Sequence, residues 1–448
     1  MSCYILSKIN KKFKKMKSIK IMGVLLLSVG TVALLTSMKK SSDRFKVKTK
    51  AEKGCVFLSV FEAEGIDSNF IYSTPVKVKE SMSSALEWIS KAQLKDGGWG
   101  AGSHSRQSVF DPHAVSSDPA TTAMVAMALL RTGSTPTTGK YSANLSLATE
   151  YLLKQIEAAD EQTLNITNQT ATQPQVKLGQ NIDVVLTTQY LTNLMDYIIN
   201  NQTLKTRVSK SLDKCVVKIQ HAQIENGSIK GAGWAGVLQS SFATNALESA
   251  KAAGADVDEA KLERYKNYQK GNFDTKTNSV ATGDGAGVML YSISGTARST
   301  AREASIAKDK ISKAKKDGKL SPSSTVTSES LQAAGMNEAD AYKYAAAYEI
   351  NQAASKQAQR NDVMNGFGSN GGEEFLSYLQ TGEGLIISKD KEWHKWYDNV
   401  SGRLLNIQNN DGSWNGHHCI TSPVFCTATS LLILSVNNDI EKLVSLNK

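Results

Sequence analysis

A seven-residue motif occurs twice in this chain and is the strongest constraint on its fold. Residues 93–99 read QLKDGGW and residues 408–414 read QNNDGSW, so Gln, Asp-Gly and Trp keep the same spacing in two distant segments. A weaker copy, QIENGSI at 223–229, keeps the Gln and the Gly but has Asn and Ile in place of Asp and Trp. An internal repeat of this kind indicates similar structural units that pack on their neighbours.

The segments on either side of the motif differ in their apolar pattern. Those that precede it have apolar residues at helical spacing, such as Met82, Ala85 and Ile89 before the first copy. Those that follow it, AMVAMALL at 123–130 and ATSLLIL at 428–434, are apolar on all sides. A helix with one apolar face belongs at a surface, whereas a helix that is apolar all round must be covered. The alternation predicts an all-α double ring of about six helical hairpins.

The same pattern predicts the domain organisation. We expect the ring over residues 77–437, a linker at 54–76 and a polar tail at 438–448. Further outer helices are expected near 146–157, 205–222, 258–269 and within 300–356, and further inner helices near 183–199, 237–252, 283–294 and 372–386. Residues 298–361 are rich in Ala, Lys and Ser and fit the ring poorly, so we interpret them as an insertion with an alanine-rich helix within 338–357.

The N-terminal 53 residues have the pattern of an export signal or a membrane anchor. Seven lysines in the first 20 residues precede an uncharged apolar core at 21–38. That core is long enough to span a bilayer, and no clear cleavage site follows it. The pattern favours a retained anchor over a cleaved signal, with the lysines on the cytoplasmic side and the rest of the chain exported into the periplasm or the extracellular space.

The charge distribution argues against a nucleic-acid partner. Residues 1–53 hold 14 of the 52 Lys and Arg residues but 2 of the 42 Asp and Glu residues, so residues 54–448 carry 38 basic and 40 acidic side chains. The basic balance therefore belongs to the N-terminal segment. The remaining sequence has no basic stripe interleaved with aromatic residues, so nucleic-acid binding is not expected.

Four cysteines follow the apolar core, and export would place them in an oxidising compartment. They are Cys55, Cys215, Cys419 and Cys426. Cys419 and Cys426 are the most plausible local disulfide pair. Free buried thiols remain the alternative.

The spacing Q-x-x-D-G-x-W, followed by a loop and an apolar helix, resembles the QW-type repeats of the squalene and terpenoid cyclases and protein prenyltransferases. The resemblance covers roughly residues 75–436 and is strong in the first and last copies. It implies an α6/α6 toroid. In such a motif the Gln amide can bond a neighbouring helix end, Asp-Gly makes the turn and the Trp packs over a helix terminus.

The catalytic signatures of those families are not found. The nearest string to a cyclase D-x-D-D motif is DVDE at 256–259, which reads as a helix cap. In SPVFCTA at 422–428 no histidine stands where a prenyltransferase would place its zinc ligand. The Gly-Cys-Gly-Glu-Gln string of the thioester-forming relatives does not occur. The resemblance therefore implies an architecture and leaves the reaction open.

The loops that lead into the inner helices should open at one end of the ring, where they hold the polar residues of any site. A closed ring would bring the first and last of these loops together. The candidate metal ligands, for zinc or a similar divalent ion, are His104, His113, His417, His418 and Cys419. The candidate catalytic residues are Asp111, His113, Asp118, Glu373 and Glu374. Helix capping and loop closure compete with both roles.

Three functions remain open from the sequence. The first is a component of the cell envelope that binds a protein or a small ligand. The second is an enzyme of unassigned chemistry, acting on an isoprenoid-like or carbohydrate substrate, with its site at the rim where the inner helices begin. The third is a scaffold, for which side chains should fill the ring axis and leave no cavity.

Overall fold

The structure is a computed structural model, and it describes residues 70–445, with side chains to residue 440. These residues belong to one compact unit and are mostly helical, so the all-α prediction is confirmed. The predicted apolar core at 21–38 and most of the linker lie outside the described residues. Between residues 70 and 445, no helix is both long enough and apolar enough to cross a membrane.

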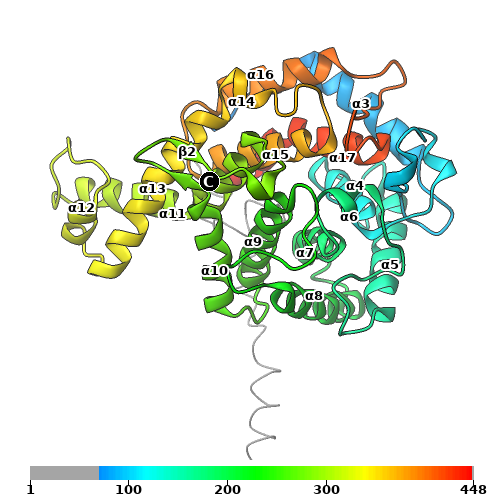
Figure 1. Ribbon diagram of the computed structural model, residues 1–448, viewed down its shortest axis with the longest axis horizontal. Helices are drawn as coiled ribbons and strands as arrows, with labels where there is room; N and C mark the ends of the chain where they lie inside the picture. The colour runs from blue at the N-terminus through cyan, green and yellow to red at the C-terminus, as the bar shows by residue number, and fades with distance from the viewer. Residues whose placement is uncertain (1–69, 446–448) are drawn as a thin grey trace, which may run out of the picture. The chain divides into compact units, whose positions relative to one another are not determined.

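Six helices lie around a common centre, and each packs on the next (Figure 1). They are α4 (Pro119–Arg131), α7 (Ile182–Leu194), α9 (Gly236–Ala252), α11 (Met289–Lys316), α15 (Gly372–Ile387) and α17 (Pro423–Leu434). The sixth, α17, packs back against α4, so the cycle closes. Every residue of α4, α7, α15 and α17 is buried, as expected for helices that are apolar on all sides.

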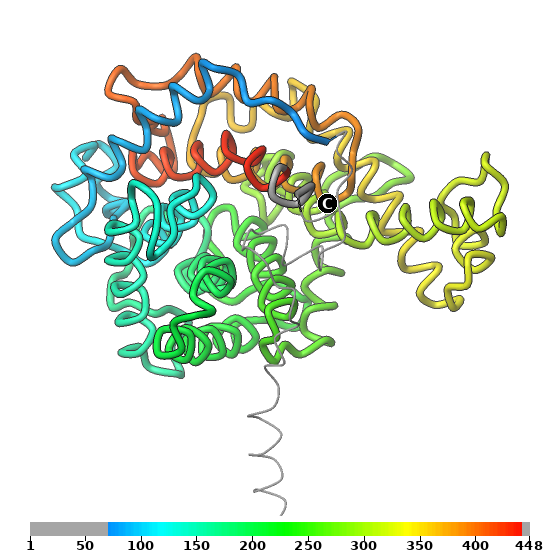
Figure 2. Tube along the Cα trace, turned by 180° about the vertical axis from the view of Figure 1, so that it is seen from behind, coloured from blue at the N-terminus to red at the C-terminus, as the bar shows by residue number. Residues whose placement is uncertain are grey.

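Six more helices cover this inner set. They are α3 (Val76–Lys91), α5 (Ser142–Ala158), α8 (Gln202–Ala222), α10 (Glu259–Gly271), α13 (Glu338–Ala358) and α16 (Trp393–Asn406). Each buries one face; in α3 the buried positions include Val78, Met82, Ala85 and Ile89. Seen from behind, α3 lies alongside α16 and α17, so the first outer helix meets the last helical pair (Figure 2).

The motif copies join these layers through matching contacts. Trp99 and Trp414 are fully buried, and each donates its indole N–H over 2.8 Å to a carbonyl of the preceding outer helix, that of Ile89 or Leu404. Asp96 and Asp411 each accept the amide N–H two residues later at 3.0 Å. The roles expected for the turn and the Trp are therefore those observed.

The glutamine of each copy bonds the next outer helix in the ring. The side-chain amide of Gln93 donates to Asn144 O in α5 at 2.9 Å, and that of Gln223 donates to Lys261 O in α10 at 2.8 Å. Gln408 donates to Ser81 O in α3 at 3.1 Å. This last bond joins the last outer helix to the first, across 327 residues.

The region expected to be an insertion includes parts of one inner helix and one outer helix. Helix α11 is continuous to Lys316, and α13 returns along it as an outer helix, close to the predicted 338–357. What projects is the end of α11, α12 (Ser328–Ala333) and the start of α13, which we call the arm (Figure 1). Its own small core is mostly alanine and includes Ala307, Ile311, Ala314 and Leu331. Because alanine gives little apolar contrast, the sequence pattern concealed the length of α11.

Shorter elements complete the described chain. The first 3₁₀ turns, η2 (His104–Arg106) and η3 (Pro112–Ala114), precede α4, and α6 (Gln173–Lys177) precedes α7. A short hairpin of β1 (Phe273–Asp274) and β2 (Ser279–Val280), followed by η5 (Gly283–Gly285), links α10 to α11; η4 (Met195–Tyr197) follows α7 and α14 (Asn361–Met364) follows α13.

The C-terminal segment differs from the polar tail that the sequence predicts. Residues Val436–Ser445 form a helix, α18, that packs on α17 and α4. Asn437, Asp439 and Ile440 are buried there. Polar side chains can be buried when they are paired, and Asp439 forms an ion pair with Arg131.

Candidate functional site

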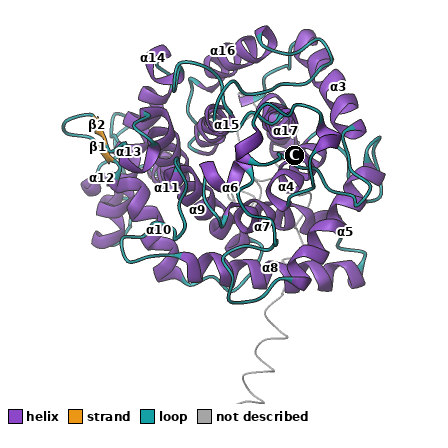
Figure 3. Cartoon of the chain, turned by 45° about the vertical axis from the view of Figure 1, so that its right-hand side comes forward, coloured by secondary structure: helices purple, strands orange, loops and turns teal. Residues whose placement is uncertain are grey.

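The connections that lead into the six inner helices lie at one end of the ring, which we call the loop face (Figure 3). Hydrogen bonds tie the first and last of them together, as a closed ring requires. The side-chain amide of Gln107 donates to Cys419 O, and Thr421 Oγ1 donates to Gln107 O at 2.7 Å. The loops that carry His104 and His417–Cys419 are therefore neighbours, although they are more than 300 residues apart in sequence.

Helix α6 lies in the middle of the loop face (Figure 3). Thr172 and Gln175 form a capping box at its start. Gln173 accepts the amide N–H groups of Thr421 and Ser422 at 2.7 and 3.0 Å, so it caps the start of α17. These bonds fix α6 to the last repeat.

Two of the candidate catalytic carboxylates cap local structure in the first repeat. Asp118 accepts the N–H groups of Thr121 and Ala101, both at 2.8 Å, and burial raises its pKa. Asp111 accepts the N–H of His113 at 2.9 Å, and both residues are exposed. The same contacts explain these side chains as helix and turn caps.

Glu374 holds the start of α15. It accepts the N–H groups of Phe367 and Gly371 at 3.1 and 2.9 Å and the hydroxyl of Tyr291 at 2.6 Å. Burial and the neighbouring Glu374 carboxylate raise the pKa of Tyr291 far above its usual range, so its phenol keeps its proton. Glu374 therefore fixes the loop before α15 to α11.

Glu373, the adjacent residue, has a different environment. It is 1% exposed, and it accepts a hydrogen bond from Ile420 N at 3.3 Å. Burial, reinforced by the Glu374 carboxylate, raises its pKa to about 8. A carboxyl group that is protonated at neutral pH can donate a hydrogen bond or a proton.

Lys177 and Cys419 interact electrostatically with Glu373. The Lys177 ammonium lies 4.6 Å from the centre of the Trp234 ring, and Trp234 is 62% exposed. Burial, together with the Glu373 carboxyl, raises the pKa of the Cys419 thiol to about 11, while Lys177 opposes that change. Burial also lowers the pKa of His104, and Lys177 adds to this effect. The loop face thus groups an amine, a thiol and a carboxyl.

The two nearby cysteines are free thiols, so the disulfide that the sequence allows is not formed. Cys426 is fully buried, and its Sγ lies 3.5 Å from Ile420 O. Burial raises the pKa of its thiol well above the ordinary value.

Two of the four candidate histidines, His104 and His418, make other contacts. Gln107 donates to His104 Nδ1 at 2.7 Å. His418 donates through Nε2 to Ser369 O at 2.8 Å and packs on Phe367, whereas His417 and His113 are exposed. Across residues 70–440, no three His, Cys, Asp or Glu side chains gather closely enough to hold a metal ion.

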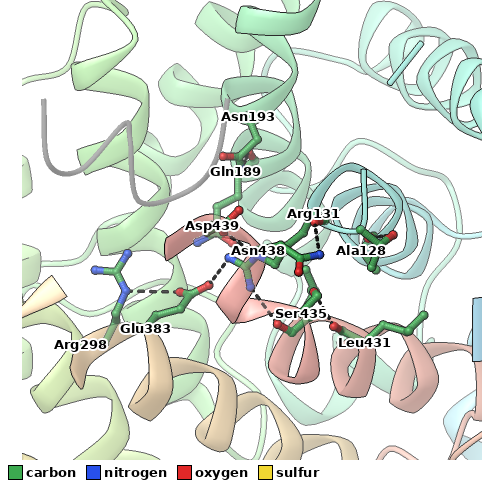
Figure 4. Close-up of polar contacts among 12 residues, drawn as sticks. Ala128, Arg131, Gln189, Asn193, Arg298, Glu383, Leu431, Ser435, Asn438 and Asp439 are labelled. Carbon is green, nitrogen blue, oxygen red and sulfur yellow. Dashed lines mark hydrogen bonds and ion pairs between the residues drawn. The ribbon is translucent and has the colours of Figure 1, made fainter. Parts of the chain in front are cut away.

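The ring axis contains a buried network of charges that sequence reasoning missed (Figure 4). Arg131 forms ion pairs with Glu383 and Asp439 at 2.8 and 2.9 Å, and Glu383 also lies 3.4 Å from Arg298. The cavity beside it measures about 30 Å³, which accommodates one or two water molecules. A signal was present, since single charged residues interrupt apolar inner helices, and such residues need a buried partner.

Comparison with known proteins adds no family assignment. No protein-family model matches the chain, and no curated protein is similar to it in sequence.

Proposed function

We propose that residues 77–437 form an α6/α6 toroid of the type found in squalene cyclases and prenyltransferases. The closed cycle of inner helices and the bond from Gln408 to α3 support this assignment. We further propose that the chain is exported and held at the membrane by residues 21–38, with the ring in the cell envelope. The lysine-flanked apolar core of that segment supports the second part.

The function that the geometry supports best is protein binding through the loop face. The main observation is that this face exposes four large apolar side chains, each on a different loop or helix start. They are Phe110, Trp234, Met289 and Phe367. Exposed Trp and Phe side chains that are held in place are typical anchors of protein interfaces. Trp234 is held by Lys177, and Phe367 by His418.

The filled axis supports this function over a ligand-binding barrel. A cavity of about 30 Å³ is far below the roughly 300 Å³ at which small-molecule pockets begin. Helix α6 lies at one end, and the buried Arg131–Glu383–Asp439 network lies at the axis. We therefore propose a partner with apolar side chains that dock on the loop face, and not one that enters the ring.

Site-specific photo-crosslinking in the cells that make the protein tests this proposal. A benzophenone side chain would replace Trp234 or Phe367 on the loop face, and Leu147 or Val217 on outer helices as matched controls. All four positions are exposed, so the substitutions should not disturb folding. We expect adducts with one protein at 234 and 367 and none at 147 or 217. Adducts at all four positions, or at the control positions alone, would exclude the loop face as the interface.

A second candidate is an enzyme with its site at the same face, which the protonated Glu373 beside Lys177 and Cys419 favours. Thermal unfolding with an isoprenoid diphosphate and with a uronate oligosaccharide tests it. A rise in Tm that Lys177→Ala abolishes would favour the enzyme. No rise with either compound would count against both substrate classes.

A further inference from the structure

A small pocket lies where the first and last repeats meet at the loop face, and we call it the seam pocket. Its volume is about 150 Å³. Helix α3, the loop before η3 and the first turn of α17 each contribute one apolar residue, and the turn of the last motif copy contributes the polar ones. The lining residues are Trp88, Phe110, Pro423, Asn409, Asp411, Ser413 and Asn415.

Asp411 is the only charged residue that lines the seam pocket. Its Oδ1 accepts the N–H and the hydroxyl of Ser413 at 3.0 and 2.6 Å. Among residues 70–440, no cationic side chain pairs with this carboxylate, and its Oδ2 accepts no hydrogen bond. The carboxylate therefore has a structural oxygen and an oxygen that is open to a ligand.

The turn itself does not need a negative charge. In the weaker motif copy, Asn226 stands at the position equivalent to Asp411. Its Oδ1 accepts the N–H and the hydroxyl of Ser228 at 2.9 and 2.8 Å, which reproduces both bonds of Asp411. Because an amide forms the same turn, the charge at position 411 is available for another contact.

The other polar groups of the pocket offer acceptors more than donors. Both N–H groups of the Asn409 amide are used, since they donate to Ser413 Oγ at 3.0 Å and to Asn415 Oδ1 at 2.9 Å. The Asn415 amide donates to Gly416 O at 3.1 Å. The side-chain oxygen of Asn409 accepts no hydrogen bond from residues 70–440. A ligand that donates hydrogen bonds and carries a positive charge complements this lining.

The apolar walls and the size of the pocket restrict that ligand further. Phe110 is 48% exposed and Trp88 is half-buried, so both rings can contact an aliphatic chain and attract a cation. A volume of about 150 Å³ is that of about five water molecules, and a lysine side chain has a similar number of non-hydrogen atoms. Arginine is larger, and its guanidinium is planar.

We propose that the seam pocket takes a lysine side chain of the protein that docks on the loop face. The methylenes of that lysine contact Trp88 and Phe110, and its ammonium lies beside Asp411. This inference rests on the function proposed for the loop face and names the chemistry of one anchor of the partner. The exposed apolar side chains then supply contact area, while the lysine fixes the orientation of the partner.

Saturation-transfer NMR on the full-length protein in detergent tests the pocket without a partner. The probe is Nα-acetyl-lysine methylamide. We expect saturable binding with a Kd on the order of 1–10 mM, because few atoms are in contact. The norleucine analogue has the same aliphatic chain without the ammonium, and it should bind about three- to fivefold more weakly.

Two matched variants test the role of the charge. Asp411→Asn keeps the turn, as Asn226 shows, and should weaken binding of the lysine probe about three- to fivefold. Asp96→Asn changes the same turn in the first motif copy, away from the pocket, and should leave the Kd unchanged. The proposal is overturned if the lysine probe does not bind, if the norleucine probe binds equally well, or if both variants have the same effect.

Photo-crosslinking in cells separates this proposal from the function on which it rests. With benzophenone at position 234, Asp411→Asn should lower the yield of the adduct about three- to fivefold, and Asp96→Asn should not. If no adduct forms even without these two changes, the docking function of the loop face fails. If adducts form with the same yield in both variants, the loop face remains the interface and the lysine anchor is overturned.

Discussion

At the scale of the residue, the loop face shows why acidic residues near inner helices are difficult to interpret. The first turn of each helix presents unpaired N–H groups, so a carboxylate there is stabilised whether or not it has a chemical role. Asp118 and Glu374 both satisfy such groups. Glu373 accepts the Ile420 N–H at a longer 3.3 Å, and burial together with the adjacent Glu374 raises its pKa to about 8.

The stability of the Glu373→Gln variant relative to the wild type should increase as the pH rises. The pKa of Glu373 in the folded chain is about 8, above the ordinary 4.5, so its contribution to stability is complete below about pH 4.5 and is lost as the pH rises through 8. Glutamine does not titrate and keeps the shape. At pH 9 the variant should exceed the wild type by on the order of 3 kcal/mol in unfolding free energy.

Urea denaturation at pH 5 and pH 9 measures this difference. The exposed Glu349→Gln on α13 is the matched control and should change little at either pH. If the difference in unfolding free energy between Glu373→Gln and the wild type were the same at both pH values, the Glu373 carboxyl would have to be ionised in the folded chain. Glu373 could then not act as an acid at this face.

Sequence reasoning found part of this site. The loops with His104 and with His417–Cys419 were expected to meet because a closed ring joins its ends, and they do. Lys177 and Gln173 were not anticipated, because α6 lies between two predicted helices and no periodicity marks a five-residue helix. Their positions depend on how the chain crosses the loop face, and the local sequence pattern does not encode this course.

At the scale of the element, the motif predicts structure well because its contacts are local. The indole of Trp414 reaches Leu404 ten residues earlier, and Trp99 reaches Ile89 at the same separation. Helices α5, α8, α9 and α15 also lie close to their predicted ranges. The sequence pattern is less informative over residues 298–361, because alanine-rich helices can be buried without the Leu and Ile that patterns detect.

The motif glycines should be less replaceable than helix glycines nearby. Gly412 has φ +92°, and an added Cβ would lie 2.9 Å from the backbone of Ser84 in α3. Gly402, inside α16, has open space around it. We expect Gly412→Ala to cost about 1–3 kcal/mol through strain and the displaced helix. Gly402→Ala should instead stabilise by about 0.5–1 kcal/mol.

Chemical denaturation of the two variants provides the comparison. Both remove a glycine from the last outer helix or its turn, so the change in the unfolded chain is the same. Equal effects would mean that α3 does not approach the turn as closely as the structure places it.

At the scale of the whole molecule, the ring is closed at its seam by two kinds of contact. Gln408 and α17 join the last repeat to the first on the outside and the inside. In the axis, Arg131 of α4 pairs with Glu383 of α15 and Asp439 of α18, so one side chain links the first, fifth and last segments. The axis therefore serves the stability of the ring.

Arg131→Met should consequently be far more costly than the loss of an equivalent arginine at the surface. Arg207 on α8 also pairs with two carboxylates, Glu150 and Glu157, but all three side chains are at least one-third exposed. Water replaces those surface contacts, so Arg207→Met should cost less than about 1 kcal/mol. Arg131 is buried with its partners, and its removal leaves their charges in a medium that solvates them poorly.

We expect Arg131→Met to cost about 3–5 kcal/mol. The same variant should lose protection against hydrogen exchange in both α4 and α17, because Arg131 also donates to Leu432 O of α17 at 3.1 Å. If Arg131→Met lowered the unfolding free energy only as much as Arg207→Met, water would have to reach the axis. A hydrated axis would favour a ligand channel over the filled ring, and the loop face would lose its place as the binding surface.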